Sequence, residues 1–210
     1  IMSSDWSSDV CSSDLLLMRP FRCLVPALAL LAAPALAEPW VTDPGHTRIL
    51  FEVEHLGFST MPGIFRDFAV ELDFDPEQVE RSTLHVVVDT ASIDMFHEQL
   101  NEHLRSDDFF AVAGHPAMEF RSTRVVPVEA DHAQVFGDLT LLGVTREIVL
   151  DVTLNQLGPH PMSGKEHVGF SATGTVDRTE FGMDYAAPAV GRNVVLSLDG
   201  EFTAPEAASD

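Results

Sequence analysis

The sequence is poor in the residues and motifs on which several enzyme classes and many small secreted folds depend. It has two cysteines, Cys11 and Cys23, and both precede residue 24. It contains no G-x-S-x-G nucleophile motif and no glycine-rich loop of the kind that binds phosphate. These absences argue against serine or cysteine nucleophile chemistry and against a disulfide framework.

Basic residues are also scarce. The chain has 12 lysines and arginines against 33 aspartates and glutamates, which gives a net charge of −21 with histidine neutral. Such an acidic surface repels both nucleic-acid phosphates and anionic lipid headgroups. The charge therefore excludes nucleic acid as a partner, and we expect any lipid to be bound inside a cavity and not on a basic face.

The first 37 residues do not read as part of the folded domain. Residues 1–17 repeat Ser-Ser-Asp three times, and we interpret them as a non-native leader or read-through. Residues 18–37 have Arg19 and Arg22, an apolar run of 13 residues at 24–36, and a small-x-small site ending at Ala37. A bilayer span needs about 20 apolar residues, so we interpret this segment as a cleaved signal peptide and not as a retained membrane anchor. We expect a periplasmic, thiol-free domain of residues 38–210.

From Thr47 onward the dominant hydrophobic period is two, which is typical of half-buried strands. Glycine, proline and aspartate separate the alternating runs. Segment 92–110 breaks the alternation and predicts a short helical segment. The pattern favours an all-β fold, an eight-stranded antiparallel β-barrel with one short helical segment. The predicted strands are 48–56, 68–74, 84–88, 118–128, 135–141, 147–154, 168–172 and 194–202.

The run at 147–154 gives the clearest prediction of strand parity. Successive side chains of a strand point to opposite faces. We therefore expect one apolar set to face the barrel interior and one polar set to face solvent. The inward set is Ile148, Leu150, Val152 and Leu154, and the outward set is Glu147, Asp151 and Thr153.

Several separated motifs occur in a fixed order between Trp40 and Phe202. They are Trp40-x-x-Asp43-x-x-His46-Thr47 with Phe51, His55-x-Gly57-Phe58-Ser59 with Gly63 and Phe65, Phe74-Asp75-Pro76, Ala91-Ser92-Ile93-Asp94, His103-Leu104-Arg105-Ser106-Asp107-Asp108-Phe109-Phe110, His115-Pro116, Phe120-Arg121-Ser122-Thr123, Gly137-Asp138-Leu139-Thr140 with Gly143-Val144-Thr145, and Arg178 with Glu180-Phe181-Gly182-Met183. In this order they resemble the YceI-like family of periplasmic polyisoprenoid-binding, lipocalin-like proteins.

The resemblance implies a lipocalin-like barrel that binds a long isoprenoid or a similar amphiphile. Phenylalanine supports this expectation, because 13 of the 14 lie in 38–210 and none brings a polar group into a cavity. One departure stands out: the family often has Arg-Asp where this chain has Leu100-Asn101, so an ion pair between these two residues at the barrel mouth would be missing here. The predicted lipid-binding residues are Phe51, Val53, His55, Phe65, Phe68, Phe109, Phe110, Phe120, Leu139, Leu150, Val152, Phe170, Phe181 and Leu196.

Histidines raise the alternative of a metal or acid–base site. His97-Glu98 and His103 resemble a stretched H-E-x-x-H, but six residues turn a helix by about 600° and place the two rings on different faces. His46 and His55 would approach each other near one barrel end, yet no third ligand is evident. We therefore expect no metal ligands, no catalytic residues and no cofactor. His55 is interpreted either as a core histidine or as a hydrogen-bond donor to a headgroup.

Three classes of function remain open. The first is a periplasmic protein that binds or carries a lipid. The second is an accessory that holds a quinone tail for a membrane cytochrome, and the third is an enzyme that acts on a lipid inside the barrel. The partners considered are the lipid itself, a membrane cytochrome, a lipid-delivery protein and a second copy of the chain in a homodimer.

Overall fold

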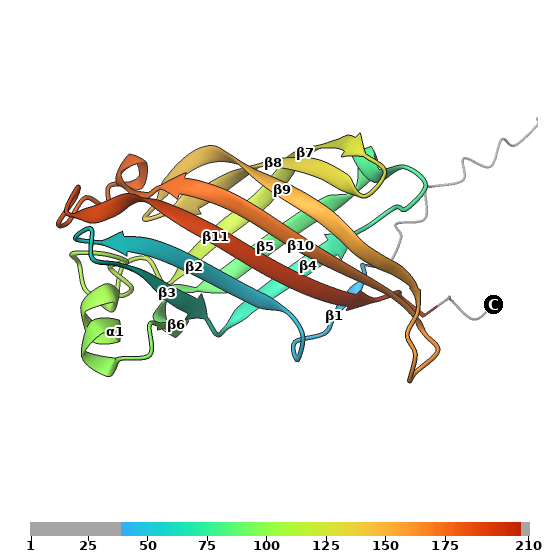
Figure 1. Cartoon of the computed structure of the whole chain (residues 1–210), viewed down its shortest axis with the longest axis horizontal. Coiled ribbons are helices and arrows are strands. Elements are labelled where there is room, and N and C mark those ends of the chain that lie inside the picture. Colours follow the sequence, from blue (N-terminus) through green and yellow to red (C-terminus); the bar gives the residue numbers. More distant parts are fainter. Residues whose placement is uncertain (1–38, 207–210) are drawn as a thin grey trace, which may run out of the picture. The chain divides into compact units, whose positions relative to one another are not determined.

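The computed structural model describes residues 39–206, so the leader and signal peptide predicted at 1–17 and 18–37 lie outside the described residues. The domain is one antiparallel sheet that curls around a common interior (Figure 1). Its strands are β1 (Val41–Thr42), β2 (Arg48–His55), β3 (Ser59–Phe65), β4 (Phe68–Asp73), β5 (Thr83–Asp89), β6 (Ile93–Asp94), β7 (Ala117–Glu129), β8 (His132–Leu141), β9 (Val144–Pro159), β10 (Glu166–Asp177) and β11 (Val190–Thr203).

The strands follow the order β4-β5-β7-β8-β9-β10-β11-β2-β3-β6, and β1 pairs beside β11. The helical part consists of α1 (Glu98–Arg105) and three 3-10 turns, η1 (Val79–Arg81), η2 (Thr90–Ser92) and η3 (Arg178–Phe181). Within residues 39–206, α1 and these turns all fall short of the length and apolarity that a membrane-spanning helix requires.

The two shortest strands tie the ends of the sheet together. β6 follows β5 through η2 and pairs with the end of β3 at Ile64 and Phe65. At the other end of the barrel β1 pairs with β11, and the residue before it, Trp40, donates its backbone N–H to Leu72 of β4 at 2.8 Å. The indole of Trp40 also donates to the carbonyl of Phe74. These contacts leave few unpaired edges, which an all-β domain must protect.

The all-β prediction is confirmed, and each of the eight predicted runs overlaps an observed strand. The prediction missed β3, which contains Pro62 and Gly63 and therefore looked like a turn. Proline is tolerated there because β6 pairs only with the last two residues of β3, so among the described residues the outer edge at Pro62 has no partner strand. The two-residue strands β1 and β6 are too short to show a period.

The predicted helical segment 92–110 is too long. Residues Ile93–Asp94 form β6, and Phe96 has a positive φ of 61°, which no α-helix accommodates. The helix ends at Arg105, where Ser106 is extended and its N–H bonds back to the carbonyl of His103. Only α1 therefore remains of the predicted segment.

Candidate functional site

The interior of the barrel holds a cavity of about 570 Å³, which lies within the usual range for small-molecule sites. Its lining comes from α1 and from every strand except β1, and it is overwhelmingly aliphatic and aromatic. On β11 the lining runs from Val190 to Phe202, about 40 Å along the strand. The cavity is therefore long and slim, a shape that suits an extended hydrocarbon chain.

Glycines opposite large side chains keep this interior open. A Cβ at Gly63 would overlap the ring of Phe51, which faces it across the β2–β3 pair. A Cβ at Gly137 would likewise overlap the ring of Phe120. The two rings can therefore lie flat against the sheet, and they line the cavity without filling it.

Strand parity in β9 follows the sequence pattern. Ile148, Leu150, Val152 and Leu154 all line the cavity, whereas Asp151 is exposed. The pattern continues on β11, where Val194, Leu196 and Leu198 line the cavity at every second position.

The structure brings twelve of the fourteen predicted lipid-binding residues together around the cavity. They are Phe51, Val53, His55, Phe65, Phe109, Phe110, Phe120, Leu139, Leu150, Val152, Phe170 and Leu196. Phe68 and Phe181 do not line it: Phe181 is fully buried in η3, and Phe68 packs against the same apolar cluster from β4. That the twelve contact lipid stays a prediction.

Sequence reasoning missed other lining residues. Some lie on strands whose alternation already indicated the same face, so the signal was present: Ile49 on β2, Val70 and Leu72 on β4, Leu84 and Val86 on β5. Others lie on the short helix α1, where the strand period does not apply: Leu100, His103 and Leu104. The rest come from irregular segments: Met95, Met183 and Tyr185.

Polar side chains gather at the mouth covered by α1. His55 at the end of β2, His103 on α1 and Tyr185 in the β10–β11 loop all line the cavity there. The His103 ring packs edge-on against Phe109 and Tyr185, with centroid distances of 5.1 and 5.3 Å. Its Nε2 lies 3.0 Å from Asp108 Oδ2. His103 is thus fixed in place, while within residues 39–206 the His55 imidazole has no side-chain hydrogen bond.

Arg178, the cation that lines this mouth, is engaged by the backbone. It is buried, and it donates to four carbonyls, those of Met183, Tyr185, Val190 and Gly191, at 2.7–3.0 Å. Burial lowers the pKa of its guanidinium. A guanidinium has five N–H donors, so this one has little capacity left for a ligand. Its role here is to hold the β10–β11 loop over the cavity.

The departure at Leu100-Asn101 has a clear structural role. Leu100 lines the cavity, and the buried Asn101 accepts from the N–H of Met95 and donates to Asp94 Oδ1 at 3.0 Å. Asp94 also accepts from Arg66. Hydrogen bonds from Asn101 and Arg66 hold the pKa of Asp94 at about 2, below its usual 3.8. This network anchors α1 to β6, and it leaves an apolar side chain where the resemblance leads us to expect arginine.

The two histidine pairs of the sequence analysis do not form joint sites. His97 is exposed at the start of α1, whereas His103 lies in the cavity mouth, as the helical spacing predicted. The expectation that His46 and His55 approach each other is wrong. His46 precedes β2 and His55 ends it, so the length of an eight-residue strand, about 25 Å, separates them.

Comparisons with known proteins agree with this architecture. Residues 40–202 match the family model of the YceI-like domain. A UPF0312 protein of Pseudomonas savastanoi pv. phaseolicola is 35% identical over 190 residues, which cover 89% of this chain and 97% of that protein. A UPF0312 protein of Staphylococcus epidermidis is 33% identical over 167 residues, covering 77% and 95% of the two chains.

Solved structures share the fold. The YCEI protein of Campylobacter jejuni is 29% identical, with a TM-score of 0.67 over 73% of this chain and 90% of that one. A polyisoprenoid binding domain from Saccharophagus degradans is 13% identical, with a TM-score of 0.59 over 81% of this chain and all of that one. At that low identity, the second likeness shows the fold alone.

Proposed function

Because the chain belongs to the YceI-like family, we propose that it is a periplasmic binding or carrier protein, and not an enzyme, that holds one long isoprenoid-type lipid inside the barrel. The observation that carries this proposal is the long apolar cavity of about 570 Å³. A domain of the same fold from Saccharophagus degradans is called a polyisoprenoid binding domain, which agrees with this proposal. The predicted signal peptide supports export.

Burial of the tail supplies the affinity. One buried methylene contributes about 0.8 kcal/mol, so a five-carbon isoprene unit contributes about 3–4 kcal/mol before the cost of ordering the chain. Five or six units already approach the practical ceiling of roughly 18–21 kcal/mol for non-covalent binding. A tail therefore needs few polar contacts, and cavity length should select among ligands more strongly than the headgroup does.

The mouth favours a neutral headgroup over a phosphate. Its cation, Arg178, is occupied by backbone carbonyls, and Leu100 presents no charge. His55 and Tyr185 instead offer hydrogen bonds to a hydroxyl or carbonyl oxygen. Asp108, which pairs with His103, adds negative charge nearby. The ligand class that fits is a polyprenol or a prenylated quinone.

The neutral mouth also suits the second candidate function, an accessory that holds a quinone tail for a membrane cytochrome. A quinone carbonyl is an uncharged hydrogen-bond acceptor, so it can accept from the donors at this mouth without needing a free cation. The two candidates differ in ligand identity and in partner. A quinone as the native ligand, together with a cytochrome that co-purifies, would favour the accessory.

Ligands with the same tail and different headgroups test the proposal. We expect geranylgeraniol to displace a fluorescent apolar probe more strongly than geranylgeranyl phosphate does. Leu100→Arg should shift this preference toward the phosphate by about ten-fold or more, because hydrogen bonds to charged groups contribute about 1.5–3 kcal/mol. Gln99→Arg is the matched control, since it adds the same charge on an exposed neighbouring position of α1. Failure of both ligands to bind would refute the lipid-binding role itself.

A further inference from the structure

The turn between β1 and β2 lies at the end of the barrel away from α1 (Figure 1). Three potential metal ligands meet at this turn. Asp43 and His46 belong to the turn between β1 and β2, and Glu201 belongs to β11. Main-chain bonding fixes their proximity, because the N–H of Asp43 donates to the carbonyl of Glu201 at 2.8 Å. One ligand atom from each of the three side chains lies within 4.8 Å of the other two.

Both carboxylates are oriented by further partners. Asp43 accepts from the N–H of Gly45 through Oδ1, and its Oδ2 lies 2.9 Å from His46 Nδ1. Oε2 of Glu201 lies 3.3 Å from Nε2 of His167, whose Nδ1 in turn contacts Thr203 Oγ1 at 3.1 Å. Outer partners of this kind hold the ligands of metal sites in position. The arrangement is therefore largely formed without an ion.

We propose that Asp43, His46 and Glu201 bind an exchangeable first-row divalent cation, with Zn²⁺ as the best fit. Two carboxylate oxygens and one imidazole nitrogen form a three-residue ligand set that leaves a coordination position for water. Mg²⁺ and Ca²⁺ fit less well, because they prefer all-oxygen sites. The strongly acidic chain raises the local concentration of cations, while the nearby Arg48, bound to the carbonyls of Gly45 and Thr47, opposes them.

The ion would clamp the turn after β1 to β11. This turn follows the short strand that links β11 to β4, so the clamp acts where the barrel end is held by few backbone pairs. A ligand that binds only the folded chain raises its stability with concentration.

Titration of the full chain with ZnCl₂, followed by calorimetry and by melting temperature, tests the site. We expect one equivalent to bind and the melting temperature to rise with zinc, while MgCl₂ has little effect. His46→Ala should abolish the rise without unfolding the protein, because its side chain is 67% exposed. His167→Ala should weaken binding by about 10–100-fold, as is usual for an outer partner.

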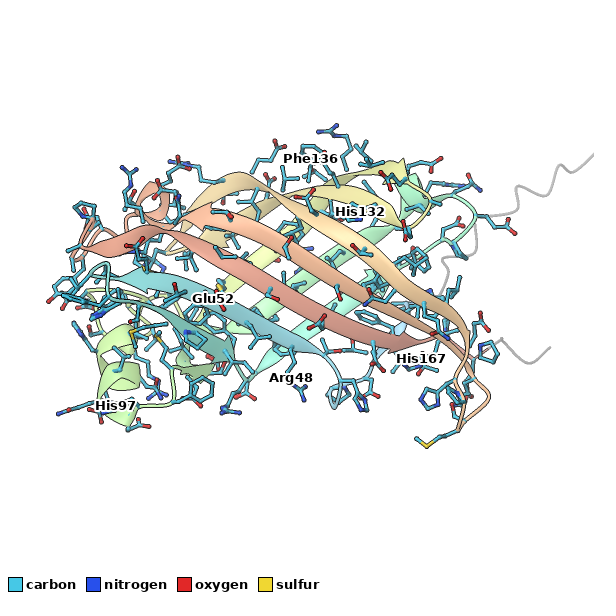
Figure 2. The ribbon with its side chains drawn as sticks, viewed as in Figure 1. Arg48, Glu52, His97, His132, Phe136 and His167 are labelled. Atoms are coloured by element: carbon cyan, nitrogen blue, oxygen red, sulfur yellow. The ribbon has the colours of Figure 1, made fainter. Side chains whose placement is uncertain are left out.

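His97→Ala is the matched control, since His97 is an exposed histidine at the opposite end of the barrel from His167 (Figure 2). This variant should bind zinc, and its melting temperature should rise with zinc, as in the unmodified chain. Equal zinc binding by the His46→Ala chain, an equal loss in the His97→Ala chain, or no zinc-dependent rise at all would overturn the proposal. In each case the three residues would be a hydrogen-bonded turn only. None of these outcomes bears on lipid binding in the cavity.

Discussion

Leu150 is a position at which a single charge should damage both the fold and the cavity. Its side chain is 5% exposed and packs with Phe120, Val125 and Val135. On β10 it faces Gly174, where an added Cβ would lie 2.8 Å from Leu150 Cδ2. The side chains that pack against this position are therefore apolar and offer a guanidinium no hydrogen bond.

The expected cost of Leu150→Arg has two parts. The burial of a leucine, about 1.5–3 kcal/mol, is lost. A charge also enters an apolar site, which costs several kcal/mol more unless water follows it. Since a domain of this size has a total stability of about 5–15 kcal/mol, the variant should lose bound lipid and unfold at much lower urea, or fail to fold. Leu150→Ala, at about 2–5 kcal/mol, gives a milder variant that should remain folded.

Asp151→Arg is the control, one residue along the same strand. Asp151 is exposed, and its carboxylate accepts a surface hydrogen bond from Gln134 at 3.1 Å. Its replacement should change stability by about 0.5 kcal/mol at most. Urea unfolding and lipid content, measured on both arginine variants, test which of the two side chains faces the cavity. Greater damage from Asp151→Arg than from Leu150→Arg would mean that the register of β9 and its cavity-lining residues are wrong.

Three further perturbations test separate parts of the structure. Gly63→Ala should force the Phe51 ring into the lumen, lower the stability by about 1–3 kcal/mol and weaken the binding of long chains. Gly169→Ala is the control, because no atom lies closer than 4.0 Å to its new Cβ, and it should have neither effect. Equal melting temperatures and lipid affinities for the two variants would contradict this expectation. His55→Phe should change the preference among headgroups more than tail affinity in probe displacement, and an equal loss for all ligands would make His55 a packing residue. Because the pKa of Asp94 falls from 3.8 to about 2 in the folded chain, its stabilisation is complete above pH 4 and is lost as the pH drops toward 2. The stability gap between the unmodified chain and Asp94→Asn in urea should therefore close over that range, and a gap independent of pH would count against the network.

Local alternation in the sequence was enough to predict eight of the eleven strands and the inward face of β9. In β9, the period of two places Leu150 inside and Asp151 outside without any knowledge of neighbouring strands. The same reasoning missed β3, because Pro62 and Gly63 resemble a turn until the strand is known to lie at an edge of the sheet. It also overextended the helix, since the positive φ of Phe96 has no signal in the residue type.

Contacts between distant parts of the chain were beyond such reasoning. Glu201 lies beside Asp43 only because β11 closes against β1, so the third ligand of the proposed metal site had no sequence signal. Contacts between separated residues also set the polarity of the cavity mouth near α1. Arg178 stands in the sequence only as a motif residue, and nothing there indicates that the backbone carbonyls of Met183, Tyr185 and Val190 occupy its guanidinium. Residue types indicate which chemistry is available, but the register of paired strands decides which groups meet.

The central claim, that the barrel carries a lipid, is tested most directly by what the protein contains when it is isolated. The protein would be purified from the cells that produce it and extracted with organic solvent. The extract would be analysed by mass spectrometry against a protein-free control. The cavity predicts a prenyl or similar long chain with a neutral headgroup at close to one equivalent. Protein that is repeatedly empty, and that takes up no added polyprenol, would contradict the claim.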